Sequence, residues 1–198
     1  MQIEIRADGA HISGYVNVTE KKSRPVITPH GKVIEEIEPR AFEQAIERAG
    51  NITVTVDHDH THVYASTDEG TVTLYEDAIG LHADVIIKDE TLIELAKKGK
   101  IRGWSFGMYN VVDTLEQRAE GLPIRRISSL DLDHITLVVN KYPAYAATSV
   151  ELRAGAEVNV EIRSFDDPPR VTEHKDKEEH KAPPDLSEYR NRINALKA

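Results

Sequence analysis

Alternation of apolar and polar residues is the feature that most constrains what this chain can fold into. Through the first 150 residues the apolar side chains recur with a period of two, the period of a half-buried β-strand. The pattern occurs in QIEIRA, NITVTVD, GTVTLYE, GLHADVII, GMYNVVDT and ISSLDLDHITLVV. Short segments of this kind, separated by turn residues, predict a mainly antiparallel β protein.

Two segments have the period of a helix instead. Residues 39–50, PRAFEQAIERAG, have a proline near their start and a glycine at their end. Residues 89–100, DETLIELAKKGK, have Asp89 as an N-cap, acidic residues in the first turn and lysines in the last. We expect each helix to cover an edge or an open end of the sheet. Their apolar stripes consist of Phe42 and Ile46 in the first segment and of Leu92, Leu95 and Ala96 in the second.

The charge of the chain restricts its partners. The formal net charge is -9, whereas a nucleic-acid-binding surface needs clustered Lys and Arg to neutralise phosphates. The one dense basic stretch follows the second predicted helix, where cations interact favourably with the helix dipole. We therefore expect no nucleic-acid partner. The stretch consists of Lys97, Lys98, Lys100 and Arg102.

The signals of membrane insertion and secretion are also missing from the sequence. No apolar run approaches the roughly 18 to 20 residues that cross a bilayer, and no basic segment followed by an apolar one begins the chain. The chain has no cysteine, which excludes disulfides, cysteine zinc sites and cysteine nucleophiles. These features predict a cytoplasmic protein with no membrane partner.

The character of the sequence changes after SVELRAG, so residues 1–153 form the predicted folded domain. Residues 154–184 mix charges with DDPPR and APP and show little apolar patterning, which predicts a flexible linker or tail. Residues 185–198 predict a short amphipathic helix, marginal alone but suited to docking. Its apolar side consists of Leu186, Tyr189, Ile193 and Leu196.

A catalytic candidate lies in GWSFG, where Ser105 stands between Gly103 and Gly107. The pattern G-x-S-x-G marks the nucleophile of many esterases, but in that fold a buried strand precedes the serine and a helix follows it. Here a helix and a basic stretch precede the serine, and the residues after it alternate like a strand. The context excludes the esterase fold. Ser105 is then either a different kind of nucleophile or a bystander between glycines that begin or bulge a strand.

Two histidines offer the partners that a nucleophilic serine needs. Strand alternation, extended through each segment, places His58 and His134 on apolar, inward faces. A serine needs a base to take its proton, and the base needs a partner that fixes its tautomer, a role that a second imidazole can fill. A single histidine on such a face is more often a core residue, but two beside a serine make a candidate set. The faces are lined by Ile52, Val54 and Val56 for His58 and by Leu130, Leu132, Thr136 and Val138 for His134.

Five motifs occur in order within a stretch that runs from about Gly14 to Arg153. They are VIEEIEPRAFEQAI, VTVDHDH, GTVTLYEDAIGLHADV, LIELAKKGKIRGWSFGM and LDLDHITLVVNKYPAYAATSVELR. In this order they resemble the prohead proteases of tailed bacteriophages, which are serine proteases related in fold to the herpesvirus maturation protease, assemblin. The resemblance implies a mainly β fold with some α, an antiparallel β-barrel flanked by helices, followed by a flexible C-terminal tail.

The resemblance also implies roles for individual residues. The family's catalytic histidine corresponds to His58 in DHD, and its nucleophile corresponds to Ser105. The third member precedes the P-A-Y motif, where many phage enzymes carry glutamate. The corresponding residue here is His134, which is similar to the Ser-His-His arrangement of the herpesvirus enzymes, and Asp131 and Asp133 are the alternatives. Candidates for the oxyanion hole are backbone N–H groups near Gly103 or Gly107 and the side chains of Arg125 or Arg126.

A function and partners follow from the same resemblance. A prohead protease is a serine endopeptidase that acts inside the immature capsid, in the host bacterial cytoplasm. Its substrates are the scaffold protein or scaffold segment, the major capsid protein and the protease itself, and a homo-oligomer is compatible with this role. No cofactor is implied. The tail fits a tether to the scaffold that self-cleavage removes, and an appendage without a role fits it equally well.

Two other functions remain open. A non-catalytic capsid-assembly or scaffolding module can keep the fold without an aligned serine and histidines. A metal hydrolase would use the histidines of DHDHTH, because an H-x-H pair on a strand suits zinc. His58 and His62 would lie roughly 13 Å apart on a straight strand at about 3.3 Å per residue, so only two of His58, His60 and His62 could bind one ion, with a distant His82. We expect no metal.

Overall fold

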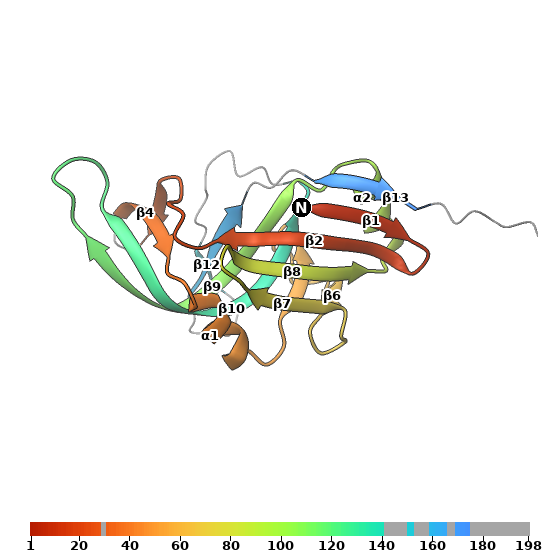
Figure 1. The fold of residues 1–198 in the computed structure, drawn as a ribbon, viewed down its shortest axis with the longest axis horizontal. Coiled ribbons are helices and arrows are strands. Elements are labelled where there is room, and N and C mark those ends of the chain that lie inside the picture. The colour runs from red at the N-terminus through yellow and green to blue at the C-terminus, as the bar shows by residue number, and fades with distance from the viewer. Residues whose placement is uncertain (29–30, 141–149, 153–158, 166–168, 175–198) are drawn as a thin grey trace, which may run out of the picture.

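The computed structural model describes residues 1–28, 31–140, 150–152, 159–165 and 169–174. Most of these residues form two β-sheets, and Figure 1 shows the five-stranded sheet in front of the long hairpin of β9 and β10. The five-stranded sheet has the order β13-β1-β2-β8-β7. Its strands are β1 (Gln2–Arg6), β2 (Gly9–Val18), β7 (Val72–Glu76), β8 (Gly80–Ile87) and β13 (Arg170–Glu173).

The second sheet has the order β11-β12-β9-β10-β4-β3, and β5 pairs with β10 and β6 beside this path. Neighbouring strands are antiparallel except in the pairs β1–β13, β10–β4 and β10–β5. The mainly antiparallel β prediction is therefore confirmed. The strands are β3 (Val26–Thr28), β4 (Gly31–Ile37), β5 (Thr53–Val56), β6 (Ala65–Ser66), β9 (Gly103–Glu116), β10 (Ile124–Val138), β11 (Val150–Leu152) and β12 (Asn159–Phe165).

Neither sheet closes on itself among the residues that the structure describes. The end strands β13 and β7 of one sheet, and β11 and β3 of the other, do not pair with each other. A barrel requires its first and last strands to pair. The predicted barrel and the herpesvirus-protease-like architecture are therefore not confirmed, whereas a mainly β fold with few helices is.

The core lies where the apolar faces of the two sheets and the two helices meet. Helix α1 (Ala41–Arg48) packs Phe42 against Phe106 of β9, with ring centroids 5.4 Å apart. Helix α2 (Glu90–Lys97) begins at the predicted cap, where Oδ1 of Asp89 accepts the N–H of Leu92 at 2.8 Å. Helix α1 packs mainly against β10, an interior strand of the second sheet, and also contacts β7, whereas α2 lies against β1, β2 and β13. The largest core side chains include Ile3, Ile12, Leu81, Ile87, Trp104, Phe106, Met108 and Leu130.

Two strands lie within the segment that the sequence assigned to a linker, residues 154–184. β12 pairs antiparallel with β9, and β13 pairs parallel with β1. The sequence NVEIRSF of β12 alternates apolar and polar residues, but the surrounding charges and prolines concealed this pattern. The folded part thus continues past the predicted boundary at residue 153. The predicted helix at 185–198 lies outside the described residues.

Candidate active site

Three residues that the sequence singled out are linked in a row by hydrogen-bonding distances, with His58 in the middle. Ser105 lies in β9 and His134 in the neighbouring β10, whereas His58 lies in the turn after β5. Nε2 of His58 is 2.8 Å from Oγ of Ser105, and Nδ1 of His58 is 2.7 Å from Nε2 of His134. The fold brings together residues 47 and 76 positions apart in the chain.

A β-bulge at Asp133 sets the direction of the His134 side chain. Leu132 pairs with Met108 of β9, and His134 pairs with the next residue, Gly107. β10 therefore carries one extra residue, Asp133, between consecutive pairs. An extra residue shifts the alternation of side chains by one position.

The bulge corrects the predicted face of His134. Leu130 and Leu132, before the bulge, belong to the core, and so do Ile135 and Leu137 after it. His134 therefore lies on the opposite face of β10 from these residues, not on the apolar face that uninterrupted alternation predicted. On that face it meets His58, which in turn contacts Ser105.

A tight turn at the end of β5 brings the chain to His58. The strand ends at Val56, and Asp57 and His58 have φ angles of 50° and 62°, in the left-handed region. The predicted placement of His58 on the apolar face of β5 is therefore wrong, because the strand does not continue to this residue. The turn directs the ring toward Ser105 and His134 instead.

Hydrogen bonds to β10 and to the residues after it stabilise this turn. The carboxylate of Asp57 accepts the backbone N–H of Val139 at 2.9 Å and that of Asn140 at 3.0 Å. The backbone N–H of His58 donates to Oγ1 of Thr136 at 3.1 Å. A left-handed residue that is not glycine costs about 1–3 kcal/mol, so these bonds are needed to hold two in succession. The imidazole of His58 is thereby fixed relative to β10.

Asp133 extends the chain of hydrogen bonds beyond His134. Its Oδ2 lies 2.6 Å from Nδ1 of His134, and the two side chains are 11% and 0% exposed. The other acidic candidate, Asp131, contacts Arg48 and Asn110 instead. The sequence offered Asp133 as an alternative third member, whereas the structure places it fourth. We call the set Ser105, His58, His134 and Asp133 the relay.

The relay has a definite number of protons to share. With Asp133 ionised and both imidazoles neutral, Ser105 has one hydroxyl hydrogen and each ring has one N–H hydrogen. These three hydrogens satisfy three bonds when Ser105 donates to His58, His58 to His134, and His134 to Asp133. In that arrangement Nε2 of His58 accepts from Ser105, which is what a general base requires.

Ser105 has a second acceptor in β12. Its Oγ donates to the backbone carbonyl oxygen of Arg163 at 2.7 Å, and Ser105 is fully buried. A hydroxyl has one hydrogen, so Ser105 cannot donate to His58 and to Arg163 at the same time. When Arg163 accepts this hydrogen, Nε2 of His58 must donate to Oγ, and complete bonding of the relay then requires one additional proton.

Beside β12 lies a second buried polar group, which consists of charged side chains. Arg125 donates to Asp113 at 2.6 Å, to Glu35 at 2.8 Å and through both terminal nitrogens to Glu161 at 2.6 and 3.0 Å. Arg163 of β12 forks onto the two carboxylate oxygens of Glu35 and also contacts Glu161. We call Glu35, Asp113, Arg125, Glu161 and Arg163 the ion cluster.

The ion cluster stabilises the charged forms of Arg125 and Glu161. Burial acts to lower the pKa of Arg125, but the carboxylates of Glu161, Asp113 and Glu35 raise it well above its ordinary value. Burial acts to raise the pKa of Glu161, but Arg125 and Arg163 lower it below its ordinary value. Arg125 and Glu161 therefore keep their charges at neutral pH.

The candidates for the oxyanion hole lie in two places. Gly103 and Gly107 are in β9, two residues to either side of Ser105. Arg125 belongs to the ion cluster, and Arg126 contacts two glutamates near the surface. Both guanidinium groups are engaged with carboxylates, so the backbone near Gly103 and Gly107 remains the simpler prediction.

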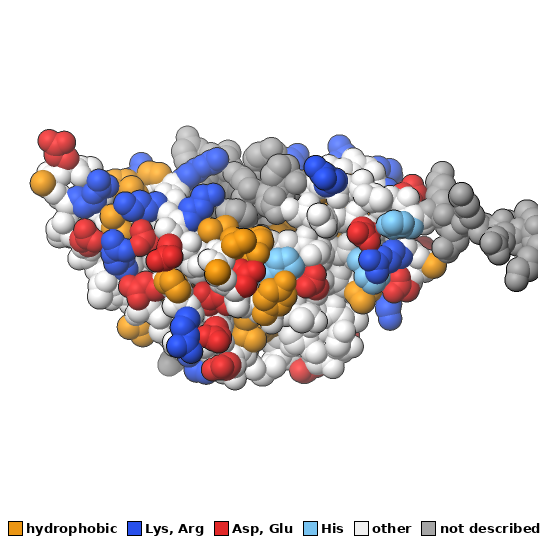
Figure 2. Space-filling view, viewed as in Figure 1, with side chains coloured by type: hydrophobic (Ala, Val, Ile, Leu, Met, Phe, Trp, Pro, Cys, Tyr) orange, Lys and Arg blue, Asp and Glu red, His pale blue; other side chains and the backbone are white. Residues whose placement is uncertain are grey.

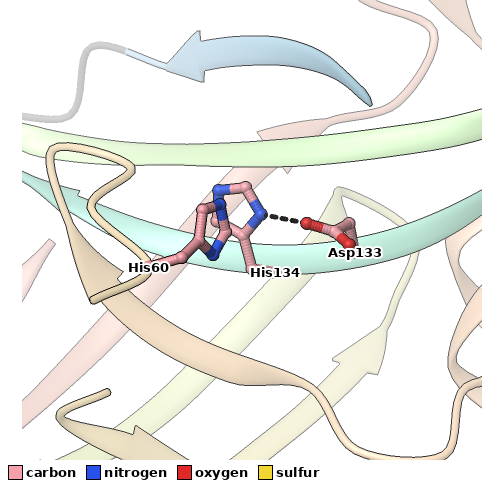
Figure 3. A group of neighbouring side chains, drawn as sticks. All are labelled: His60, Asp133 and His134. Atoms are coloured by element: carbon pink, nitrogen blue, oxygen red, sulfur yellow. Dashed lines mark hydrogen bonds and ion pairs between the residues drawn. The ribbon is translucent and has the colours of Figure 1, made fainter. Parts of the chain in front are cut away.

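Figure 3 shows three side chains that form a possible metal-ligand set, His60, Asp133 and His134. Their ligand atoms lie within 4.8 Å of one another, and the His60 ring meets the His134 ring edge-on at 4.3 Å. The histidines that the sequence offered as further ligands lie elsewhere, His62 against a tyrosine and His82 between two tyrosines of the five-stranded sheet. Because His134 already uses both ring nitrogens in the relay, an ion here would have to displace one of those bonds.

The surface and the helices bear on the expected partners. On the face that Figure 2 shows, Lys and Arg are interspersed with Asp and Glu rather than gathered into a basic patch. Each of the two described helices has eight residues, too few to cross a bilayer.

Comparison with known families gives a match over most of the chain. The family model described as caudovirus prohead serine protease matches residues 1–161. No curated protein and no solved structure matches the chain. The matched span contains all four relay residues and ends within β12.

Proposed function

The chain belongs to the caudovirus prohead serine protease family, and from this premise we propose that Ser105 is the nucleophile of a serine endopeptidase, with His58 as general base and His134 as the residue that orients it. Membership implies in general a serine protease of phage capsid maturation. The observation that supports these residue roles is the unbroken series of hydrogen bonds, 2.8, 2.7 and 2.6 Å long, from Ser105 to Asp133.

The proposed reaction proceeds by acyl transfer. Oγ of Ser105 attacks a peptide carbonyl carbon while Nε2 of His58 takes the hydroxyl proton. His58 then gives this proton to the leaving amine, the C–N bond breaks, and water hydrolyses the acyl-enzyme with the same base. His134 holds the Nδ1–H of His58, and Asp133 holds the Nδ1–H of His134. A carboxylate at the far end supplies the negative charge that a second neutral imidazole lacks.

The proposed substrates are the scaffold protein or scaffold segment, the major capsid protein and the protease itself. The proposed location is the interior of the immature capsid in the host bacterial cytoplasm, and assembly into a homo-oligomer is compatible with this setting. These finer assignments follow from the family resemblance. Neither a cofactor nor a metal enters the proposed mechanism.

A Ser105→Ala variant tests the proposal. We expect the wild-type chain, incubated at high concentration, to be cut into fragments visible by mass spectrometry, and the variant to lose about 10⁶-fold in rate, as for other serine nucleophiles. Ser66→Ala is the matched control, because Ser66 is also buried in a strand but lies outside the relay. Cleavage by Ser105→Ala at the wild-type rate would contradict the role of Ser105. Identical intact masses for wild type and variant would instead favour a non-catalytic capsid-assembly module.

A further inference from the structure

β12 occupies the edge of β9 next to Ser105. Among the described strands, β9 has β10 on one side and β12 on the other, and Ser164 pairs with Ser105 in the antiparallel register. An extended peptide can bind a protein by adding a strand to such an edge, with main-chain hydrogen bonds for affinity and side-chain pockets for specificity. β12 has the geometry of a bound peptide of this kind.

The peptide group that meets the serine is the one between Arg163 and Ser164. The carbonyl oxygen of Arg163 is 2.7 Å from Oγ of Ser105, so the carbonyl group and the hydroxyl are in direct contact. Near-attack geometries place the reacting atoms about 3–3.5 Å apart, which a hydroxyl in contact with the carbonyl oxygen reaches by a small shift. Arg163 thus occupies the place of the substrate residue whose carbonyl carbon the serine attacks.

The side chain at this position lies in a buried acidic site. Nη2 of Arg163 is 2.6 Å from Oε1 of Glu35, Nε contacts the other oxygen, and the Glu35 side chain is 4% exposed. Without β12, the cluster keeps two carboxylates, Glu35 and Asp113, and one guanidinium, Arg125, which sum to -1. An unbalanced negative charge in a buried site is costly, so this site favours a positive side chain. The planar fork of arginine fits both oxygens, whereas lysine offers one point charge.

Glu161, two positions before Arg163, contacts a positively charged side chain. Both terminal nitrogens of Arg125 contact the carboxylate of Glu161, at 2.6 and 3.0 Å. Between Glu161 and Arg163, Ile162 is buried and pairs with Gly107. The three positions therefore have three distinct environments, one cationic, one apolar and one anionic.

We propose that β12 lies in the substrate position of the site, and that the enzyme cleaves extended peptides after arginine when an acidic residue stands two positions before it and an aliphatic residue lies between them. This inference rests on the proposed function. Ser105 attacks the carbonyl carbon of the arginine, the bond to the next residue breaks, and the hydroxyl proton passes through His58 to the released amine. Water then frees the arginine carboxylate and restores Ser105. Glu35 is the residue that determines specificity for arginine.

The chain itself carries the pattern acidic–aliphatic–Arg in three places. Besides Glu161-Ile162-Arg163, it occurs in Glu151-Leu152-Arg153 and in Glu4-Ile5-Arg6. The last lies in β1, paired on one side with β2 and on the other with β13, so it is not available as an added strand. Self-cleavage is therefore expected after Arg163 and Arg153, and the bond after Arg6 is expected to stay intact.

Peptide cleavage by the full chain tests the specificity. The probe is a fluorogenic peptide, NVEIRSFD, with matched peptides in which Arg becomes Gln or Lys, or Glu becomes Gln. We expect kcat/KM to fall about 100-fold for Gln in place of Arg and about 10-fold for Lys, because Gln leaves Glu35 and Asp113 with Arg125 as their one cation in the cluster. Equal rates for the Arg and Gln peptides, together with their loss in Ser105→Ala, would overturn the specificity and leave the proposed function standing. No Ser105-dependent cleavage of any peptide or of the chain would overturn both.

A binding measurement separates recognition from catalysis. The full chain with Ser105→Ala and Arg163→Ala has no nucleophile and no native arginine in the acidic site, so a labelled peptide can compete for the edge of β9. By fluorescence anisotropy, the Arg peptide is expected to bind at least about 30-fold more tightly than the Gln peptide. Adding Glu35→Gln should remove this preference, with circular dichroism as the check on folding. Equal affinities for the two peptides would overturn the proposed placement of substrate, whatever the catalytic result.

Discussion

The relay and the ion cluster are both polar groups buried along β9, β10 and β12, but they differ in how their hydrogens and charges are balanced. In the ion cluster three carboxylates face two guanidinium groups, a net charge of -1, and arginine donors are directed at carboxylate oxygens throughout. In the relay two imidazoles carry one hydrogen each and can exchange them along the chain. The cluster is suited to holding strands together, and the relay is suited to moving a proton. Strand β12 joins them, because Arg163 contributes its side chain to one and its carbonyl oxygen to the other.

The largest expected effect is a loss of stability when the ion cluster loses one of its arginines. Arg125→Met leaves the buried carboxylate of Glu35 and the partly buried carboxylates of Asp113 and Glu161 with one arginine, and breaking a buried pair in this way costs about 3–5 kcal/mol in the free energy of unfolding. Arg126→Met is the control, since Arg126 is a half-exposed neighbour whose ion pairs are worth about 0–1 kcal/mol. Urea denaturation followed by circular dichroism gives both values. A loss below 1 kcal/mol for Arg125→Met would mean that the cluster is not the structural element we describe.

The second largest expected effect is a loss of activity when the relay loses its carboxylate while the fold is preserved. In Asp133→Asn the side-chain amide donates to Nδ1 of His134, which moves the hydrogen of His134 to Nε2. His134 then donates to Nδ1 of His58, so Nε2 of His58 carries the hydrogen and no longer accepts from Ser105. We expect kcat/KM to fall about 10- to 100-fold, less than when the carboxylate contacts the base directly.

Asp131→Asn provides the matched control for this change. Asp131 lies two residues away on β10 but contacts Arg48 and Asn110 rather than the relay. Its activity should stay within about twofold of wild type, since surface substitutions of this kind have small effects. If both variants lost activity equally, Asp133 would act through the stability of β10 and not through the relay.

The smallest effect is the pH dependence of the ion cluster. The pKa of Glu161 is lowered in the folded chain because Arg125 and Arg163 outweigh the effect of its burial. A lowered folded-state pKa contributes stability above the unfolded value of 4.5, and this contribution is lost as the pH falls through the folded value. The difference in unfolding free energy between wild type and Glu161→Gln should therefore be larger at pH 7 than in strong acid. Urea titrations at both pH values measure it, and a difference that grew in acid would contradict the direction of the pKa shift.

The elements of the fold were largely predictable because most of them depend on neighbours in sequence. Alternation marked β8 over residues 80–87, and Asp89 marked the start of α2. Helix α1 begins later than its sequence suggested, after Arg40. The group that caps its first turn belongs to β7 and not to a neighbouring residue in the sequence. The carboxylate of Glu76 in β7 accepts the N–H groups of Arg40 and Glu43 at 2.7 and 2.8 Å. A cap supplied from 36 positions away leaves no local signal.

The identities of the site residues were predictable, whereas their placement was not. Alternation put both histidines on apolar faces, since it assumes strands without interruptions. The turn after β5 and the bulge at Asp133 each redirect one histidine ring away from the predicted apolar face. Because both rings are redirected toward the same place, His58 still links His134 to Ser105. A bulge depends on the register between two strands, which no single segment of sequence displays. β12 was missed because charges and prolines surround its alternating sequence, and because the partners that bury its own charges, Glu35 and Arg125, are distant in the chain.

The attachment of β12 to the rest of the chain has a consequence for when the site can act on other proteins. A segment tethered to its own binding site competes at an effective concentration on the order of millimolar, however weak each contact is. A peptide from another molecule must approach that concentration to take the edge of β9. Dilute solution does not provide it, whereas a confined space packed with substrate does. The position of β12 next to Ser105 would in this way make turnover depend on crowding.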